Sequence, residues 1–444
     1  MATIANVLQQ VQTYQRSGLG YLQNLNCFIG DVTNKKFKDF QKITANLGST
    51  VTYDLPPRYT QTNGLIANLQ PSVQRLQPLT IDQGTNVSFS FTAQERIFNV
   101  DKDTESYMKV FGESAVEQLG AFIEENIALT CISAMPVNDN AGNPTGALHT
   151  ESGPYRFFGD GVTPINSFQQ LAQMEANFRN FGAVTKDQLK IVLADTMIPS
   201  IIGNGLNQFA TNRNEKLANS WQLGKVSGLP GDYFISNRLP IQNAGTVGNS
   251  AQVLTVLTTN DPTGNNITQI TFSGATPGDA NAVKAGDLFQ FQDGVSGQPN
   301  LRFLTFIGQT PSAQPVQFRA VSNAAADGSG HVTVSFGLPN WALQSTPGAT
   351  QNINNNIVAG MQVKALPTHR AGLVVTGDAF FLGMPQLPKQ PPFDTANEYD
   401  DETGVAMRMT YGSTFGQNQL GMVYDCIWGA SLNPDYCMRI AIPV

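Results

Sequence analysis

The chain has 444 residues and a formal net charge of −7, and this length accommodates about two to four domains. Charged residues make up only 13% of the sequence, about half of the usual share, and Asn, Gln, Ser and Thr supply most of the polarity. The acidic balance argues against a protein that grips nucleic acid through a basic face, and no run approaches the ~18 apolar residues of a membrane span. Such a composition suits a self-associating protein and an ordinary β-rich secreted protein equally.

Residues 1–48 are predicted to form an N-terminal arm. Apolar residues recur at helical spacing in 3–15, and Thr3 can cap this helix. Met1 is followed by neither a basic segment nor a long apolar stretch, so no signal peptide is expected. A lysine cluster later in the arm indicates either a solvated surface or a binding contact, and its members are Lys35, Lys36, Lys38 and Lys42.

Residues 49–92 contain two predicted strands, at 49–58 and 87–91, where apolar residues alternate with polar ones. The connection over residues 56–84 is repeatedly interrupted by Pro and Gly. A connection of this length inside a compact domain is uncommon and is usually functional.

The strongest helix prediction covers residues 101–135. Apolar residues recur at three- and four-residue steps from Met108 to Cys131, and Pro136 stops the pattern. At 1.5 Å per residue this helix is roughly 45 Å long. Its polar side is marked by three glutamates, Glu113, Glu117 and Glu124.

Residues 151–242 mix helices and strands. Helical spacing is found in 167–181 and again in 195–209, on either side of a strand predicted at 187–194. A segment with spaced glycines follows in 223–240. Its distinctive residues are Gly224, Gly228, Phe234, Ser236, Asn237, Leu239 and Pro240.

The composition changes at about residue 243. From there to about residue 356 the chain is rich in Gly, Asn, Thr and Ser, and turn residues separate short alternating runs. Six such runs at this spacing indicate a small antiparallel β-barrel, or more generally a separate β module. The predicted strands are 253–257, 267–272, 287–291, 302–307, 316–320 and 332–336.

The C-terminal part contains no catalytic motif, but its order is distinctive. An apolar segment ends in residues 379–382, and a strand with an outward Arg408 follows. Asp425, Gly429 and Pro434 then precede a final strand.

This order of elements and motifs resembles the major capsid proteins of tailed phages, of the Hong-Kong-97 type. The resemblance spans nearly the whole chain, and residues 283–295 are similar to part of the inserted domain of some short-tailed-phage coat proteins. It implies an α+β fold with an N-terminal arm, an extended hairpin (the E-loop), a peripheral domain with a spine helix, an axial domain and an inserted antiparallel β-barrel. It also implies self-assembly into an icosahedral head shell, built from hexamers and pentamers, around a double-stranded DNA genome.

The resemblance divides the chain into five parts. These are 1–48 for the arm, 49–92 for the E-loop hairpin with its flanking strands, 93–150 and about 395–418 for the peripheral domain, 151–242 with about 366–394 and 419–444 for the axial domain, and 243–365 for the inserted barrel. The ends of a tolerated insertion must lie close together. Deletion of 246–356 is therefore expected to leave a core that folds.

The resemblance places the E-loop hairpin on the neighbouring subunit. The charges expected to pair between subunits are Arg58, Arg75, Asp82 and Arg408. No lysine occurs between Lys42 and Lys102, so an isopeptide cross-link through the hairpin is not expected.

The implied partners are further copies of the chain, a scaffolding protein, a portal protein, a decoration protein and DNA packaged without sequence specificity. Because only a short arm precedes the hairpin strands, the scaffolding protein is expected to be a separate chain. It would bind, as packaged DNA could, at the lysine cluster of the arm. The expected location is the virion, after assembly in the host cytoplasm.

No residue pattern predicts an enzyme, a cofactor or a metal site. The four cysteines lie far apart and are expected to be buried free thiols in a reducing compartment. The three histidines have no metal-ligand or triad companion nearby in sequence, and the acidic run 398–402 lacks the spacing of a Ca²⁺ loop. Two alternatives stay open, an encapsulin-like compartment shell and a β-rich carbohydrate-binding or hydrolytic protein.

Overall fold

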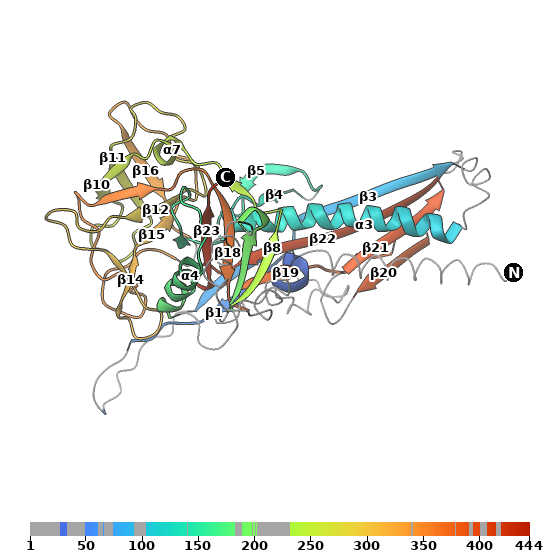
Figure 1. The fold of residues 1–444 in the computed structure, drawn as a ribbon, viewed down its shortest axis with the longest axis horizontal. Helices are drawn as coiled ribbons and strands as arrows, with labels where there is room; N and C mark the ends of the chain where they lie inside the picture. Colours follow the sequence, from blue (N-terminus) through green and yellow to red (C-terminus); the bar gives the residue numbers. More distant parts are fainter. Residues whose placement is uncertain are drawn as a thin grey trace, which may run out of the picture.

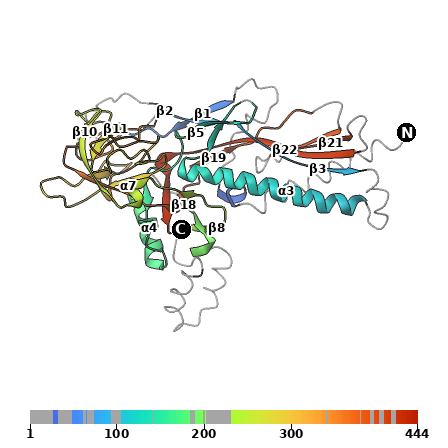
Figure 2. The same ribbon diagram turned by 90° about the horizontal axis from the view of Figure 1, so that it is seen from above.

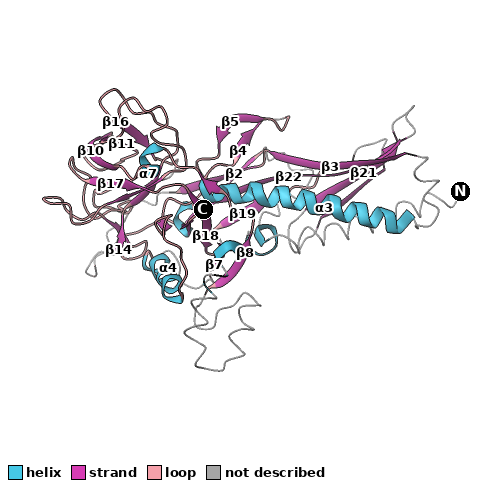
Figure 3. Cartoon of the chain, turned by 45° about the horizontal axis from the view of Figure 1, so that its top comes forward, coloured by secondary structure: helices cyan, strands magenta, loops and turns pink. Residues whose placement is uncertain are grey.

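The computed structural model describes residues 27–32, 49–60, 65, 74–92, 104–139, 141–182, 189–197, 199, 201, 231–338, 341–377, 379–389, 394–399, 406–413 and 419–444. These residues form an elongated molecule (Figure 1). One long helix lies along long strands at one end, and a separate group of short strands lies at the other end. Strands dominate the described part and helices are few (Figure 3), which confirms the predicted α+β class.

The long predicted helix is α3 (Thr104–Ala128), and a 3-10 turn, η3 (Leu129–Ile132), continues it. The turn ends at Ser133, whose φ of 55° is left-handed, so the helix stops slightly before the predicted end. Its apolar side is fully buried in the larger of two main hydrophobic cores, through Val116, Leu119, Ile123 and Ile127. None of the described helices combines the length and hydropathy that a membrane-spanning helix requires.

One glutamate of α3 contradicts the prediction. Glu124, expected on the polar side, is buried, and its carboxylate accepts the backbone N–H groups of Phe28 at 2.8 Å and Ile29 at 3.4 Å. Both belong to a π-helical turn, η1 (Phe28–Val32), whose apolar residues join the same core. Periodicity assumed that this side of the helix faces solvent, whereas η1 covers it.

A long antiparallel sheet lies beside α3 (Figure 2). Its order is β19-β22-β21-β20, and β3 pairs with β22 on the other edge of β21's partner. The pairing of β3 with β22 is the longest in the molecule's described part and runs from Gln83–Trp428 to Thr92–Gln419. The strands are β3 (Gln83–Thr92), β19 (Phe380–Gly383), β20 (Asp394–Tyr399), β21 (Ala406–Ser413) and β22 (Gln419–Leu432).

A second sheet has the order β6-β23-β18-β7-β8, with β9 paired to β18. It lies between the long sheet and the distal strands (Figure 1), and most of its central strands are buried in the larger core. The strands are β6 (Phe157–Phe158), β7 (Lys190–Ala194), β8 (Asp232–Ser236), β9 (Ile241–Gln242), β18 (His369–Val375) and β23 (Cys437–Ile442).

Helix α4 (Phe168–Asn180) confirms the helix predicted at 167–181. Its N-terminus is a capping box, in which the Ser167 hydroxyl accepts the Gln170 N–H and the Gln170 side chain accepts the Ser167 N–H. A 3-10 turn, η4 (Asp195–Met197), opens the stretch predicted as helical at 195–209. Residues 202–230, with Gly224 and Gly228, lie outside the described residues.

Residues 243–365, called the module below, form their own sheet of order β15-β12-β17-β10-β11-β16, with every pairing antiparallel. The edge strands approach each other, because the Val321 N–H after β15 donates to the Ser335 carbonyl of β16 at 2.9 Å. The elements are α7 (Thr246–Asn249), β10 (Val253–Thr259), β11 (Gln269–Ser273), β12 (Leu288–Phe291), β13 (Arg302–Leu304), β14 (Pro311–Pro315), β15 (Gln317–Arg319), β16 (His331–Ser335) and β17 (Gln362–Ala365).

All six strands predicted in the module are found, although two others were missed. β13 leaves the sheet to pair with the unpredicted β14, and the unpredicted β17 lies at the sheet's centre. The chain enters and leaves the module at one place, since Gln242 pairs with His369 and the Ala244 N–H donates to the Thr368 hydroxyl at 3.1 Å. A deletion of 246–356 would leave β17 behind, so the cut must extend past Ala365.

Two hairpins flank these sheets. β1 (Thr50–Leu55) pairs with β2 (Arg75–Thr80), and β4 (Pro136–Asn138) pairs with β5 (Pro144–Leu148). The predicted strand at 49–58 is therefore one leg of a hairpin. Its second leg, β2, lies inside what was predicted as a connection.

Candidate functional site

The candidate site is the hairpin base, defined here as the ends of β1 and β2 nearest the module together with the C-terminal turn on which they rest. Leu55 lies opposite Arg75 in the hairpin register, and Arg58 follows β1. Both arginines converge on Asp435, in the 3-10 turn η5 (Pro434–Tyr436). Three distant parts of the sequence thus meet at one carboxylate.

Asp435 is almost completely buried and is held by several donors. The Arg75 guanidinium lies 2.8 Å from its Oδ2, the Arg58 guanidinium 3.6 Å from its Oδ1, and the Tyr155 hydroxyl donates to Oδ1 at 3.1 Å. Burial acts to raise the pKa of Asp435, but the two arginine charges outweigh it and lower the pKa. The turn itself is set by the Asn433 side chain, which accepts the Asp435 N–H at 3.0 Å.

Two further contacts dock the hairpin on β22. The Gln77 amide donates to the Glu151 carbonyl at 2.9 Å and to the Ser431 hydroxyl at 3.3 Å. The Ser431 hydroxyl donates to the Pro78 carbonyl at 2.8 Å, and the Tyr53 ring lies 4.2 Å from the Phe381 ring. The hairpin base is thereby fixed by buried polar contacts rather than by a deep apolar core.

Gly429 explains the close approach of the hairpin to β22. A Cβ at this position would lie against the Thr80 carbonyl, 2.8 Å from its carbon, and 2.9 Å from the Ile81 Cα. Only glycine leaves this space. Asp425, Gly429 and Pro434, noted in the sequence as one motif, therefore form an ion pair, admit the hairpin and start η5, respectively.

Asp82 lies at the other end of the hairpin, just before β3, and forms an ion pair with His149. The His149 Nε2 lies 2.9 Å from Asp82 Oδ2, and its Nδ1 lies 2.8 Å from Glu151 Oε1. Although burial opposes charging, these carboxylates raise the pKa of His149 to about 9. The imidazole is therefore a cation at neutral pH and ties the start of β3 to the end of β5.

Arg408 contradicts the expectation of an outward side chain. Its guanidinium is buried and forms a two-pronged ion pair with Asp425 on the adjacent strand β22, while Nη1 donates to the Pro388 carbonyl at 2.7 Å. Arg58, Arg75, Asp82 and Arg408 all have partners within one chain, and their role between subunits stays a prediction.

Buried arginines also form the contact between the module and the rest of the molecule, called the seam below. Arg319 of β15 donates to the carbonyls of Thr150 at 2.7 Å and Ser152 at 2.9 Å. Arg439 of β23 donates to the Cys131 carbonyl at 3.0 Å and, across the seam, to the Gly286 carbonyl at 2.9 Å. Burial lowers the pKa of Arg319 to about 10 and that of Arg439 to about 9.

The described residues contain no group of His, Cys, Asp and Glu that could hold a metal ion. Burial raises the pKa of the Cys131 thiol to about 12, and Cys426 and Cys437 are likewise buried with raised pKa values, as expected of inert thiols. His369 is buried, and its pKa is lowered to about 4 by that burial. The lysine cluster at 35–42 and residues 400–402 of the acidic run lie outside the described residues.

The sequence did not reveal Asp435, His149 or the seam arginines as important positions. Asp435 had one local signal, because Asn-Pro-Asp marks a turn. His149 and Arg319 had none, since their partners lie far away in the sequence. Their importance follows from tertiary contacts alone.

A scan against protein-family models and a search of curated proteins both find no match. Among solved structures, the chain is similar to the capsid of cyanophage P-SCSP1u, with 12% identity over 92% of this chain and 88% of that chain and a TM-score of 0.38. It is also similar to the capsid of Ralstonia phage GP4, with 10% identity over 91% and 86% and a TM-score of 0.41. A chain of Mycobacterium phage Che8 has 9% identity over 93% and 90% and a TM-score of 0.41.

Proposed function

We propose that this chain is a phage major capsid protein that self-assembles into the head shell enclosing the genome. The observation that carries the proposal is the combination of α3 lying along a long sheet with a hairpin docked by its base on β22. This layout corresponds part for part to the spine helix, peripheral sheet and E-loop of the Hong-Kong-97 type, in the order that the sequence motifs led us to expect.

The proposed division of the chain follows the sheets. The long sheet and α3 form the peripheral domain, and the sheet of β6, β23, β18, β7 and β8 forms the axial domain. β22 pairs with β3 and β21 over most of its length, so we assign residues 419–432 to the peripheral domain rather than to the axial one. The rest of the C-terminus, with β23, stays in the axial domain.

We propose that the module is an inserted β-barrel. Its sheet is all antiparallel, its edge strands are joined by the Val321–Ser335 hydrogen bond, and its entry and exit lie side by side. The module has its own hydrophobic core, to which the rest of the chain contributes only Tyr155 and Phe181. A self-contained body of this kind can be inserted into a shell fold without rebuilding it.

The proposed partners are those that a shell requires. They are copies of the chain in hexamers and pentamers, a separate scaffolding protein, a portal protein, a decoration protein and DNA bound without sequence specificity. No catalytic role is assigned to any described residue. The virion is the proposed location.

Negative-stain microscopy of the purified protein tests the proposal directly. Shells, tubes or capsomer rings are expected, and sedimentation should show particles far larger than a 47.9 kDa chain. A variant in which residues 59–73 are replaced by a short Gly-Ser linker is the matched control, because it keeps both hairpin strands but shortens the connection. It should stay folded by circular dichroism and assemble poorly. Dispersed monomers under all salt conditions and scaffolding additions would refute the proposal.

A further inference from the structure

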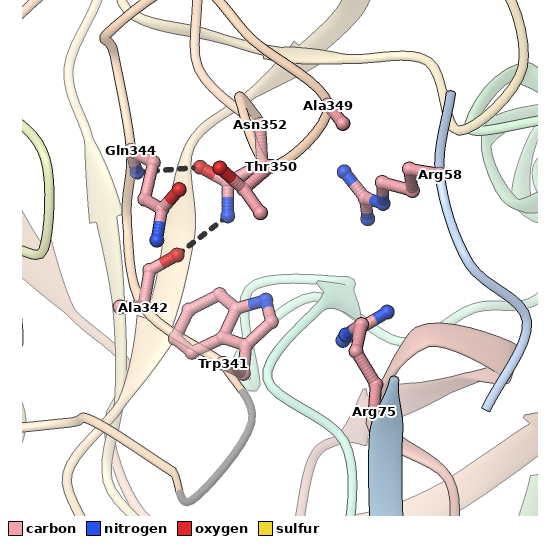
Figure 4. Close-up of a pocket in the computed structure, with 8 residues that line it drawn as sticks. All are labelled: Arg58, Arg75, Trp341, Ala342, Gln344, Ala349, Thr350 and Asn352. Atoms are coloured by element: carbon pink, nitrogen blue, oxygen red, sulfur yellow. Dashed lines mark hydrogen bonds between the residues drawn. The ribbon is translucent and has the colours of Figure 1, made fainter. Parts of the chain in front are cut away.

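A small pocket lies between the hairpin base and the module. Its volume is about 60 Å³, and Figure 4 shows its two walls facing each other. One wall carries Arg58 and Arg75, and the other is formed by a module loop with Trp341, Ala342, Gln344, Ala349, Thr350 and Asn352. Because a water molecule takes about 30 Å³ of liquid volume, the pocket has room for a group of the size of a carboxylate.

The pocket lies against a cluster with more cations than anions. Arg58 and Arg75 share the single carboxylate of Asp435. A third guanidinium, that of Arg156, is buried in the same cluster, where it donates to the Asp435 carbonyl at 2.9 Å and stacks 3.8 Å from the Phe181 ring. Three guanidinium groups therefore face one carboxylate, which favours a second anion beside them.

Trp341 supplies an independent indication of a ligand. Its side chain is 6% exposed, and its indole Nε1 has no hydrogen-bond acceptor within bonding geometry among the described residues. Figure 4 shows this nitrogen directed into the space between the two arginines. A buried donor without an acceptor is costly, and an oxygen placed in the pocket would accept from it.

Both walls are held in place without the ligand. The Asn352 amide donates to the Ala342 carbonyl at 2.6 Å, and its oxygen accepts the Gln344 N–H at 2.8 Å. On the opposite side, the Arg58 guanidinium lies 4.5 Å from the Phe306 ring centroid. Donors on preformed walls lose little conformational freedom when an anion binds.

From this geometry we infer that the pocket is a carboxylate-binding site formed by Arg58, Arg75 and the Trp341 indole. We further infer that its occupant in assembled particles is an acidic side chain from a second copy of this chain. The second inference rests on the proposed function. Each copy has 33 Asp and Glu residues against 26 Lys and Arg, and the pocket lies at the base of the hairpin proposed to contact the neighbour.

The site itself is tested on unassembled protein with acetate as the probe. 5-Fluorotryptophan labelling gives one ¹⁹F signal for each of the three tryptophans, and Trp341→Phe identifies the relevant one. Acetate that replaces chloride at constant ionic strength should shift this signal saturably. Arg58→Gln should weaken binding by at least about tenfold, whereas Arg302→Gln, an arginine of the module outside the pocket, should leave it unchanged. A Trp341 signal that acetate does not move would overturn the site.

The source of the carboxylate is tested by assembly yield. If a second copy supplies it, acetate should lower the yield of wild-type particles relative to chloride, and it should have no effect on the already reduced yield of Arg58→Gln. Equal yields in acetate and chloride would assign the pocket to a free anion and overturn the second-copy inference. If no variant or condition produces particles, the proposed function fails, whereas the ¹⁹F titration still decides whether the site exists.

Discussion

The module and the framework, by which we mean the described residues outside 243–365, are built in opposite ways. Paired strands of the module are near each other in sequence, as in β10 with β11 or β11 with β16. The central pairing of the framework joins β3 to β22, so Gln83 lies opposite Trp428. The module can fold from local pairings, whereas the framework closes only when both ends of the chain are present.

The two regions also have separate hydrophobic cores. The framework core contains α3 and the strands of both large sheets, and the module core contains nearly only module residues. Between them lies the seam, where Arg319, Arg439 and Gln317 donate mostly to backbone carbonyls. We therefore expect two stability units joined by a polar contact, and the following substitutions test this view from the largest expected effect to the smallest.

Gly429→Ala should have the largest effect, and should confine it to the framework. The new Cβ would collide with the Thr80 backbone, which cannot move without undocking the hairpin. A loss of about 3 kcal/mol in unfolding free energy is expected, at the upper end of overpacking costs. Hydrogen exchange should accelerate in β1, β2 and the end of β22, and should stay unchanged in the module.

Gly421→Ala is the control for that substitution. Gly421 lies on the same strand, but its Cβ would meet nothing nearer than the Gly412 carbonyl at 3.8 Å, which is an ordinary contact. It should therefore cost much less. Equal destabilisation by both substitutions would show that glycine in β22 is needed for the strand itself and not for hairpin docking.

This contrast also explains what the sequence could predict. The six module strands and α3 were predicted correctly because their patterns are local. β17 was missed because its four residues carry no clear alternation, and the partner of β22 could not be read from a pattern within β22. Glu124 and Arg408 were expected to face solvent, but η1 covers one and Asp425 pairs with the other. The site residue Asp435 depends on contacts with residues hundreds of positions away.

Arg319→Met tests the seam. It removes the donors of the Thr150 and Ser152 carbonyls, each of which costs about 1–3 kcal/mol when left buried and unpaired. Relief of the buried charge offsets part of this loss, so a net destabilisation of about 3 kcal/mol is expected. Denaturant titration followed by hydrogen exchange should then resolve separate midpoints for module and framework.

Arg302→Met serves as the comparison for the seam substitution. Arg302 is a more accessible module arginine that pairs with Asp293 at 2.7 Å, so its loss should change stability by about 1 kcal/mol or less. If Arg319→Met leaves a single shared transition, the two regions form one cooperative unit and the view of two units is wrong.

Glu124→Gln should change the pH dependence of the framework alone. Burial raises the pKa of Glu124 to about 7 from a model value of 4.5, so the folded state keeps a proton that the unfolded state loses between these values. Wild-type stability is therefore full below pH 4.5 and falls as the pH rises to 7. Glutamine removes this fall, and the variant should gain about 2–3 kcal/mol relative to wild type across that range.

The control is Glu117→Gln, which removes an exposed carboxylate from the same helix. Its stability should follow the wild-type pH profile. A Glu124→Gln profile parallel to wild type from pH 4.5 to 7 would mean that the carboxylate is already ionised when buried. A shift in the module transition would contradict the independence of the two regions.

The smallest effect concerns two threonine pairs of the same chemistry. Thr271 and Thr333 lie opposite each other in the module sheet with hydroxyls 2.9 Å apart, and Thr50 and Thr80 do so in the hairpin at 3.1 Å. Both pairs are exposed. Double-mutant cycles to alanine should give a coupling of about 0.5 kcal/mol in the module, because cross-strand pairs of this kind contribute roughly 0.2–1 kcal/mol.

The hairpin pair should couple more weakly in unassembled protein. A two-stranded hairpin is marginally stable in water, so its Thr50–Thr80 end opens often at little cost, whereas β11 and β16 are held in a sheet with its own core. If assembly covers the hairpin with a neighbour, the Thr50–Thr80 coupling measured from particle yield should rise to the value found in the module. Equal coupling in both pairs before assembly would mean that the hairpin is already as ordered as the module sheet, and that its docking on β22 alone is sufficient.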